Sequence, residues 1–157
     1  MNIVVKSIKD HVPREAKLLD IGCGMKKHEY YTKDVTTIDA WDKLDPDILM
    51  DVSKEPLPFE EDSFDVITMI DFIEHIEKHE GEELLEQCKK IASRIIVFTP
   101  LFFNDNSHNV ENPNCWAYGN PYDYHKSLWT LDDFSDWTTI DIFTFKDGKV
   151  WLGYWER

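Results

Sequence analysis

The chain has 157 residues, a length that suits one domain with a single hydrophobic core. Hydrophobic residues make up 42% of it, so extensive disorder is not expected. Acidic residues number 31 against 17 lysines and arginines, and the net charge of −14 disfavours binding of nucleic acid through a basic face. No stretch approaches the ~20 apolar residues of a membrane span, and no secretory leader is evident. Three cysteines without a CxxC pair suit a reducing compartment, so we expect a cytoplasmic protein with one domain over residues 1–157.

The first hundred residues alternate between helical and extended patterns. Apolar residues at helical spacing in the N-terminal segment, 1–16, predict a short helix that ends before Pro13. Short apolar or β-branched runs then predict five buried strands, and an amphipathic pattern over 81–92 predicts a helix before the last of them. The predicted strands are residues 17–24, 35–41, 47–52, 64–70 and 94–99.

The C-terminal third begins with a polar segment, 104–120, that has no hydrophobic period. We therefore predict a long loop and assign 101–128 as an acceptor-binding or lid loop. Thr130 and the acid three positions later have the spacing of a helix cap. Two β-rich segments, 137–145 and 150–155, flank an Asp-Gly pair and predict a hairpin. The whole pattern predicts an α/β fold with a mostly parallel sheet and an antiparallel edge.

Three successive predicted strands end in an acidic residue. Asp20 precedes the pair of glycines in Gly22-Cys-Gly24, whose backbone can turn with positive φ and let a ligand approach closely. Asp39 stands where a carboxylate can accept hydrogen bonds from both hydroxyls of a ribose. Asp51, with Val52 beside it, could meet an adenine edge. Each acid alone could instead cap a turn, but their joint occurrence favours a nucleotide site.

These motifs resemble those of class I S-adenosylmethionine (SAM)-dependent methyltransferases. Leu-Leu-Asp-Ile-Gly-Cys-Gly at 18–24 is similar to their glycine-rich first motif, and 47–67 resembles their third and fourth motifs. Phe-Ile-Glu-His-Ile at 72–76 resembles a signature of the type 11 group. The resemblance covers about 17–100, with a weaker match at 125–134. It implies a Rossmann-like, mostly parallel seven-stranded sheet with a C-terminal antiparallel hairpin and helices on both faces.

The same resemblance implies a cofactor site for SAM and its product S-adenosylhomocysteine (SAH). Asp20 would lie near the methionine ammonium, Asp39 on the ribose and Asp51 on the adenine amino group. The implied cofactor-binding residues are Asp20, Gly22, Cys23, Gly24, Asp39, Ala40, Asp51, Val52, Asp71 and Phe72. The sequence departs from the family where Met-Lys-Lys-His at 25–28 replaces a third glycine, so the first crossover helix should be short or irregular. The same gap disfavours a dinucleotide dehydrogenase.

The candidate catalytic residues are Asp71, Glu74, His75 and His125. The two histidines are candidate bases because imidazole titrates near neutral pH, although either could be structural. If a helix begins near 71, the first three of these residues share one of its faces. With His125 they could hold a divalent metal. Their spacing resembles the metal-binding arrangement of small-RNA 2′-O-methyltransferases and a related element of quinone-biosynthesis O-methyltransferases.

The sequence therefore predicts a SAM-dependent methyltransferase that acts on an oxygen or nitrogen of a small-molecule or glycan-like acceptor. Two alternatives stay open: a metal-assisted O-methyltransferase of RNA ends or of quinone- or catechol-like acceptors, and a SAM-binding module without catalysis. Trp116, Tyr118, Tyr122 and Tyr124 could form either a satellite core or a wall of the acceptor pocket. A second copy of so small a domain could close that pocket, which would make the protein a homodimer.

Overall fold

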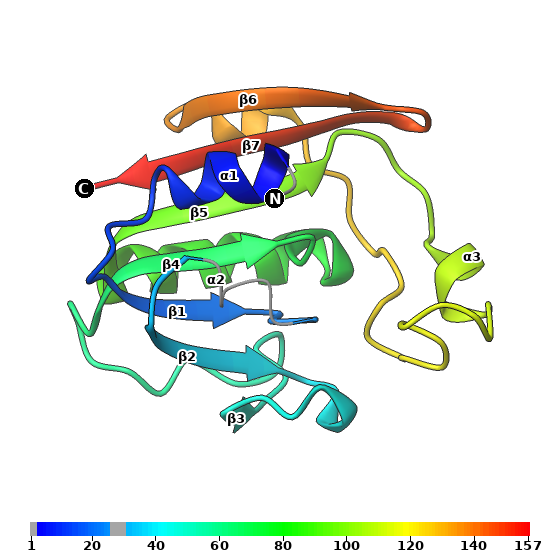
Figure 1. Ribbon diagram of the computed structural model, residues 1–157, viewed down its shortest axis with the longest axis horizontal. Helices are drawn as coiled ribbons and strands as arrows, with labels where there is room; N and C mark the ends of the chain where they lie inside the picture. The colour runs from blue at the N-terminus through cyan, green and yellow to red at the C-terminus, as the bar shows by residue number, and fades with distance from the viewer. Residues whose placement is uncertain (1–2, 26–30) are drawn as a thin grey trace.

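A seven-stranded sheet forms the centre of the protein in the computed structural model, which describes residues 3–25 and 31–157 (Figure 1). Its strand order is β3-β2-β1-β4-β5-β7-β6, and only the pairs that involve β7 are antiparallel. The predicted mostly parallel sheet with a C-terminal hairpin is thus confirmed. The strands are β1 Lys17–Ile21, β2 Asp34–Asp39, β3 Ile48–Leu49, β4 Phe64–Ile70, β5 Ala92–Pro100, β6 Thr138–Phe145 and β7 Gly148–Glu156.

Helices cover both faces of this sheet. In Figure 1, α1 (Ile3–Lys9) crosses in front of β5, while α2 (Lys78–Ile91) lies behind β4. The two helices pack into two different apolar clusters, which shows that they lie on opposite faces. Their buried side chains are Val4 and Ile8 on α1, and Leu84, Leu85, Cys88 and Ile91 on α2. Within the described ranges, no helix has the length and apolar character needed to cross a bilayer.

The central strands are apolar on both sides because both of their faces are covered. Leu19 of β1, Ile67 of β4 and Ile95 of β5 pair across the sheet and are fully buried. Burial of each such side chain contributes about 1.5–3 kcal/mol. This row of side chains fixes the parallel register, and with it the positions at which the strands end.

The predicted C-terminal hairpin is confirmed, with β7 between β5 and β6 as an inner strand, but its turn is shorter than expected: Phe145 pairs with Gly148, so the turn is 146–147 and the glycine begins β7. Trp151 of β7 is fully buried and stacks on Phe134, with ring centroids 4.0 Å apart. Phe134 belongs to a short 3-10 helix, η4 (Leu131–Phe134), and the predicted cap is present there. Thr130 and Asp133 form a capping box at its start.

Several predicted boundaries differ from those observed. Strand β3 has two residues instead of six, because the Asp47 side chain accepts hydrogen bonds from the backbone N–H and hydroxyl of Thr37 in place of a longer ladder. The predicted loop contains a short helix, α3 (Ser107–Val110), and another 3-10 helix, η2 (Asp42–Leu44), follows β2. The sequence also predicts a short or irregular first crossover helix after Gly24. Most of that segment, including residues 26–28 of the Met-Lys-Lys-His stretch, lies outside the described residues.

Candidate active site

A pocket of about 410 Å³ lies at the carboxyl ends of the parallel strands. Its walls are the turns after these strands and the long segment 101–128, which lies beyond the ends of the strands in Figure 1. Every residue that the sequence singled out for cofactor binding or catalysis lines this one pocket. These residues are Asp20, Gly22, Cys23, Gly24, Asp39, Ala40, Asp51, Val52, Asp71, Phe72, Glu74, His75 and His125.

The glycine turn after β1 is held against β2. The backbone N–H groups of Gly22 and Cys23 both donate to the carbonyl of Ile38, at 2.9 and 3.2 Å. Gly22 and Gly24 have φ of 70° and 49°, which side-chain-bearing residues adopt at a cost. A Cβ on Gly22 would overlap the Phe72 ring, whereas a Cβ on Gly24 would meet no atom of the described residues closer than 3.9 Å. Gly22 is therefore required by packing, and the space above Gly24 stays open for a ligand.

Asp39 joins the end of β2 to this turn. One of its carboxylate oxygens accepts from the backbone N–H of Gly24 at 3.3 Å, and the other from that of Trp41 at 2.9 Å. Burial raises the pKa of Asp39 above its usual value, while these backbone hydrogen bonds oppose the rise. Each carboxylate oxygen can accept a further hydrogen bond, so the side chain remains able to hold hydroxyl groups of a ligand.

The other two strand-end acids have different local roles. Asp20 is buried and accepts a 2.6 Å hydrogen bond from the hydroxyl of Thr68, its register neighbour on β4. Asp51 accepts from both the backbone N–H and the hydroxyl of Ser53, at 3.0 and 2.7 Å. The turn-capping alternative thus applies to Asp51, which nevertheless lines the pocket beside the buried Val52.

The segment after β4 is not the helix that the sequence predicted. Asp71 has a φ of 51°, and its N–H donates to the carbonyl of Phe98, so no helix begins there. Residues Ile73–His75 form a 3-10 turn, η3, and Ile76 is extended. Helix α2 begins only at Lys78, after a capping box made by Glu77 and Glu80. The expected helical face with Asp71, Glu74 and His75 is therefore wrong.

The turn η3 nevertheless brings Glu74 and His75 next to His125 from the distant loop. Ligand-type atoms of these three residues all lie within 4.8 Å of one another, in a group that does not include Asp71 among the described residues. The imidazole rings of His75 and His125 meet edge to face with centroids 4.7 Å apart. Glu74 is buried, and its Oε2 accepts a 2.9 Å hydrogen bond from the hydroxyl of Thr99.

Burial sets the protonation of this group. Burial, and then the negative charge of Asp71, raise the pKa of Glu74 well above its usual value. Burial, and then the neighbouring His125, lower the pKa of His75 to about 4. Burial also lowers the pKa of His125. Both imidazoles are therefore neutral at pH 7, and each has a nitrogen lone pair that can accept a proton or bind a metal.

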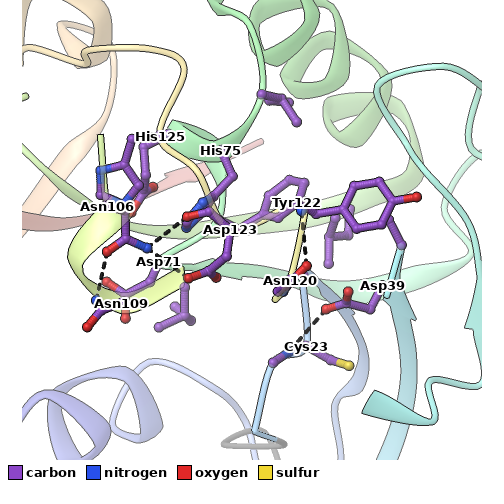
Figure 2. A pocket seen from close by; sticks show the side chains of 18 of the residues that line it. Cys23, Asp39, Asp71, His75, Asn106, Asn109, Asn120, Tyr122, Asp123 and His125 are labelled. Carbon is purple, nitrogen blue, oxygen red and sulfur yellow. Dashed lines mark hydrogen bonds between the residues drawn. The ribbon is translucent and has the colours of Figure 1, made fainter. Parts of the chain in front are cut away.

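A hydrogen-bonded network shapes the loop that carries His125. The amide of buried Asn106 donates to both the carbonyl and the carboxylate of Asp123, each at 2.7 Å (Figure 2). Asn109 donates to the side-chain oxygen of Asn106 at 2.7 Å. Burial raises the pKa of Asp123 to about 6, although the Asn106 hydrogen bond opposes this. The sequence analysis missed Asn106 and Asp123 individually; the richness of this loop in asparagine was their only signal.

Two of the four loop aromatics whose role the sequence left open lie in the pocket wall, and none of the four belongs to a buried apolar cluster of the described residues. Trp116 and Tyr122 line the pocket, whereas Tyr118 is exposed and lies outside the pocket lining, as does Tyr124. The Trp116 ring reaches within 3.9 Å of a Cβ built on Gly24, so the loop extends over the glycine turn. The same loop thus contributes to both ends of the pocket.

The pocket is strongly acidic. Among the described lining residues, Lys126 is the one lysine or arginine. Against it stand the carboxylates Asp20, Asp39, Asp51, Asp71, Glu74, Asp123 and Asp147. The walls therefore suit neutral or cationic ligands and disfavour phosphate groups.

Residues 19–94, just under half of the chain, match a protein family described as a methyltransferase domain. No curated protein matches the sequence. Among solved structures, a SAM-dependent methyltransferase from Methanosarcina mazei is similar, with a TM-score of 0.60 and 14% identity over 98% of this chain and 95% of that one. The 1,6-didemethyltoxoflavin-N1-methyltransferase of Burkholderia thailandensis, with its substrate and SAH bound, has a TM-score of 0.65 and 13% identity over 99% of this chain and 77% of that one.

The magnesium protoporphyrin IX methyltransferase of Synechocystis, also with bound SAH, has a TM-score of 0.63 and 12% identity over 98% of this chain and 80% of that one. These three proteins share the fold of the present chain from end to end. The family match covers the strands and turns that build the acidic, glycine-lined half of the pocket. Residues 19–94 thus match a methyltransferase domain, and the chain has the fold of these SAM-dependent methyltransferases.

Proposed function

We propose that the chain transfers the methyl group of SAM to an oxygen or nitrogen of a small, neutral or cationic acceptor, with glycan-like molecules among the candidates. The observation that carries this proposal is the convergence of all the predicted cofactor-binding and catalytic residues on one pocket. Fold neighbours that contain SAH support the choice of cofactor.

The pocket residues fit SAM in chemistry as well as in position. Asp39 offers carboxylate oxygens to the ribose hydroxyls, and the open space at Gly24 admits the cofactor close to the backbone. Asp20 and Asp71 supply negative charge for the methionine ammonium and the sulfonium side. Bound SAM supplies an electrophilic methyl group in an in-line displacement.

The protein's own contribution is to align the acceptor and to take up its proton where the acceptor carries one. His75 and His125 are neutral at pH 7 because burial lowers their pKa values, so each has a lone pair to offer, but with a pKa of about 4 His75 is a weak base, which makes His125 the better candidate. The loop 101–128 would seat the acceptor opposite the cofactor, with Trp116 and Tyr122 as apolar walls. These assignments make the loop the part of the chain that selects the acceptor.

The charge of the pocket guides the choice of acceptor class. An acceptor phosphate would face the carboxylates of six aspartates, since the raised pKa of Glu74 favours its neutral form, with Lys126 as the one lysine or arginine among the described lining residues. Hydroxylated rings and amines avoid this repulsion, and the asparagines of the loop can hydrogen-bond to them. We therefore favour such acceptors over RNA ends. Cytoplasmic location and a homodimer stay predictions.

Calorimetric titration with SAH tests the cofactor part of the proposal. We expect a dissociation constant in the micromolar range, or about −8 kcal/mol. A folded protein that binds no SAH would overturn the proposal. Labelled SAM offered with panels of hydroxylated, amine and phosphorylated acceptors then tests transfer. Tight SAH binding with no transfer to any panel would instead favour a SAM-binding module without catalysis.

A further inference from the structure

We infer that Glu74, His75 and His125 form a binding site for a divalent transition-metal cation whose open coordination positions face the pocket. Its use in catalysis, as the group that binds the acceptor oxygen, rests on the proposed methyl transfer. The binding of the cation itself rests only on the three side chains and their surroundings.

The three residues are close enough to share one ion. Their ligand-type atoms lie within 4.8 Å of one another. Nitrogen and oxygen ligands lie about 2.0–2.2 Å from such a cation, so two ligands of one ion stand roughly 3–4.4 Å apart. Small rotations of the side chains would therefore complete the coordination. The two imidazoles lie side by side at one wall of the pocket (Figure 2).

The unsatisfied state of His75 is a second observation that points to a ligand. His75 is 9% exposed, and its Nδ1 has no hydrogen-bond partner in the described part of the chain. Buried polar atoms are almost always paired, so this nitrogen is an exception that needs an explanation. A cation bound between His75 and its two neighbours supplies one.

The surrounding backbone holds the three ligands in place. Thr99 donates to one oxygen of the Glu74 carboxylate and leaves the other available. The N–H groups of Lys126 and Ser127 donate to the backbone carbonyl of Glu74 at 2.8 and 3.1 Å. His125 is therefore tied, through the next two residues, to the turn that carries the other two ligands. Such support from outside the ligand set is typical of metal sites.

The composition of the site indicates which cations it takes. Imidazole nitrogens suit cobalt, nickel or zinc better than manganese, magnesium or calcium, which prefer oxygen ligands. Three protein ligands leave at least one position open, as in catalytic metal sites. An acceptor hydroxyl bound there would have a lowered pKa and would lose its proton to water. The oxygen would then form the bond to the methyl carbon while the carbon–sulfur bond breaks, and the electron pair of that bond would stay on sulfur.

Cobalt binding to the untagged, chelator-treated protein tests the inference without an activity assay. We expect one Co²⁺ per chain by calorimetry and a visible absorption band of nitrogen-ligated cobalt. His125→Ala should weaken binding by at least about 100-fold, beyond the 10–100-fold typical of outer-shell changes. His79→Ala is the matched control, since this exposed histidine of α2 lies outside the pocket lining and should leave cobalt affinity unchanged.

The remaining variants and titrations distinguish the outcomes. Glu74→Gln should also weaken cobalt binding, and intact SAH binding by either variant would show that it is folded. Absence of cobalt binding to the folded protein, or equal affinity of His125→Ala and His79→Ala, would overturn the inference. Displacement of cobalt by an equal concentration of Mg²⁺ would contradict the inferred preference of the site for transition-metal cations. If SAH binds and cobalt does not, the metal site fails alone; if cobalt binds and SAH does not, the proposed function fails alone.

Discussion

The two halves of the pocket are built in different ways. On the cofactor side, Asp20, Asp39 and Asp51 come at or just after the ends of parallel strands, and the register of the sheet places them together. On the acceptor side, His125 and Asp123 belong to a loop held by a few polar contacts with η3 and with its own asparagines. The position of the strand ends therefore does not depend on these side chains, whereas the position of the loop depends on individual residues that hold it.

The largest expected effect comes from Trp129, which directly follows the loop 101–128 and contacts Lys78 of α2. Trp129 is buried under Lys78, and its indole N–H donates to Ile73 and to Ser127. Trp129→Ala should lower the free energy of unfolding by about 3–5 kcal/mol, as for large aromatic side chains in cores. Urea denaturation measures this. Trp116→Ala is the control: this indole is 48% exposed, and its loss should cost far less.

The glycine turn offers the sharpest test of the cofactor half. Gly22→Ala would force a Cβ into the Phe72 ring and should weaken SAH binding by about 100-fold, or ~2.7 kcal/mol. Gly119→Ala is a matched control, because Gly119 has nearly the same φ, 73° against 70°, but no atom within 4 Å of its Cβ. The variants thus share the backbone strain and differ in the overlap. Equal SAH affinities in calorimetry would contradict the packing argument.

A smaller effect is expected for Asp39, the carboxylate that we propose holds the ribose. Asp39→Ala should weaken SAH binding by about 1.5–3 kcal/mol, the scale for hydrogen bonds to a charged group. Asp42→Ala, an exposed acid three residues later, should leave the affinity unchanged. Because burial raises the pKa of Asp39, its protonation should begin to weaken SAH binding at a higher pH than for an exposed aspartate. If the Asp39→Ala variant binds SAH as tightly as the unaltered protein, the assignment of Asp39 to the ribose is wrong.

The smallest expected effect concerns the Ser127 hydroxyl, which makes two hydrogen bonds at the end of the loop. Ser127 donates to the carbonyl of Ile73 at 3.3 Å and accepts from the Trp129 indole at 3.0 Å. Ser127→Ala should cost about 1 kcal/mol in thermal or urea unfolding, because the indole keeps its bond to Ile73. Ser135→Ala, on the exposed surface, serves as the reference. A loss as large as that for Trp129→Ala would mean that the hydroxyl, and not the ring, holds the loop.

The positions of the strand-end residues were predictable because their signals are local in sequence. Glycine pairs and acids at or after apolar runs mark strand ends, so the place of Gly22 and Asp39 at one edge of the sheet could be expected before the structure was known, while their roles toward SAM stay predictions. The segment after β4 was not predictable in this way, because the left-handed φ of Asp71 has no sequence signature and displaced the expected helix. Asp123 was missed because its partner Asn106 lies 17 residues away in a segment without periodicity.

Glu74 contributes two different groups to the site. Its carboxylate faces the pocket, while its backbone carbonyl receives the N–H groups of Lys126 and Ser127. A substitution changes the side chain and leaves the carbonyl in place. The chemistry at this position can therefore diverge over evolution without releasing the loop that carries His125, so that one scaffold can serve methyl transfers with different proton or metal requirements.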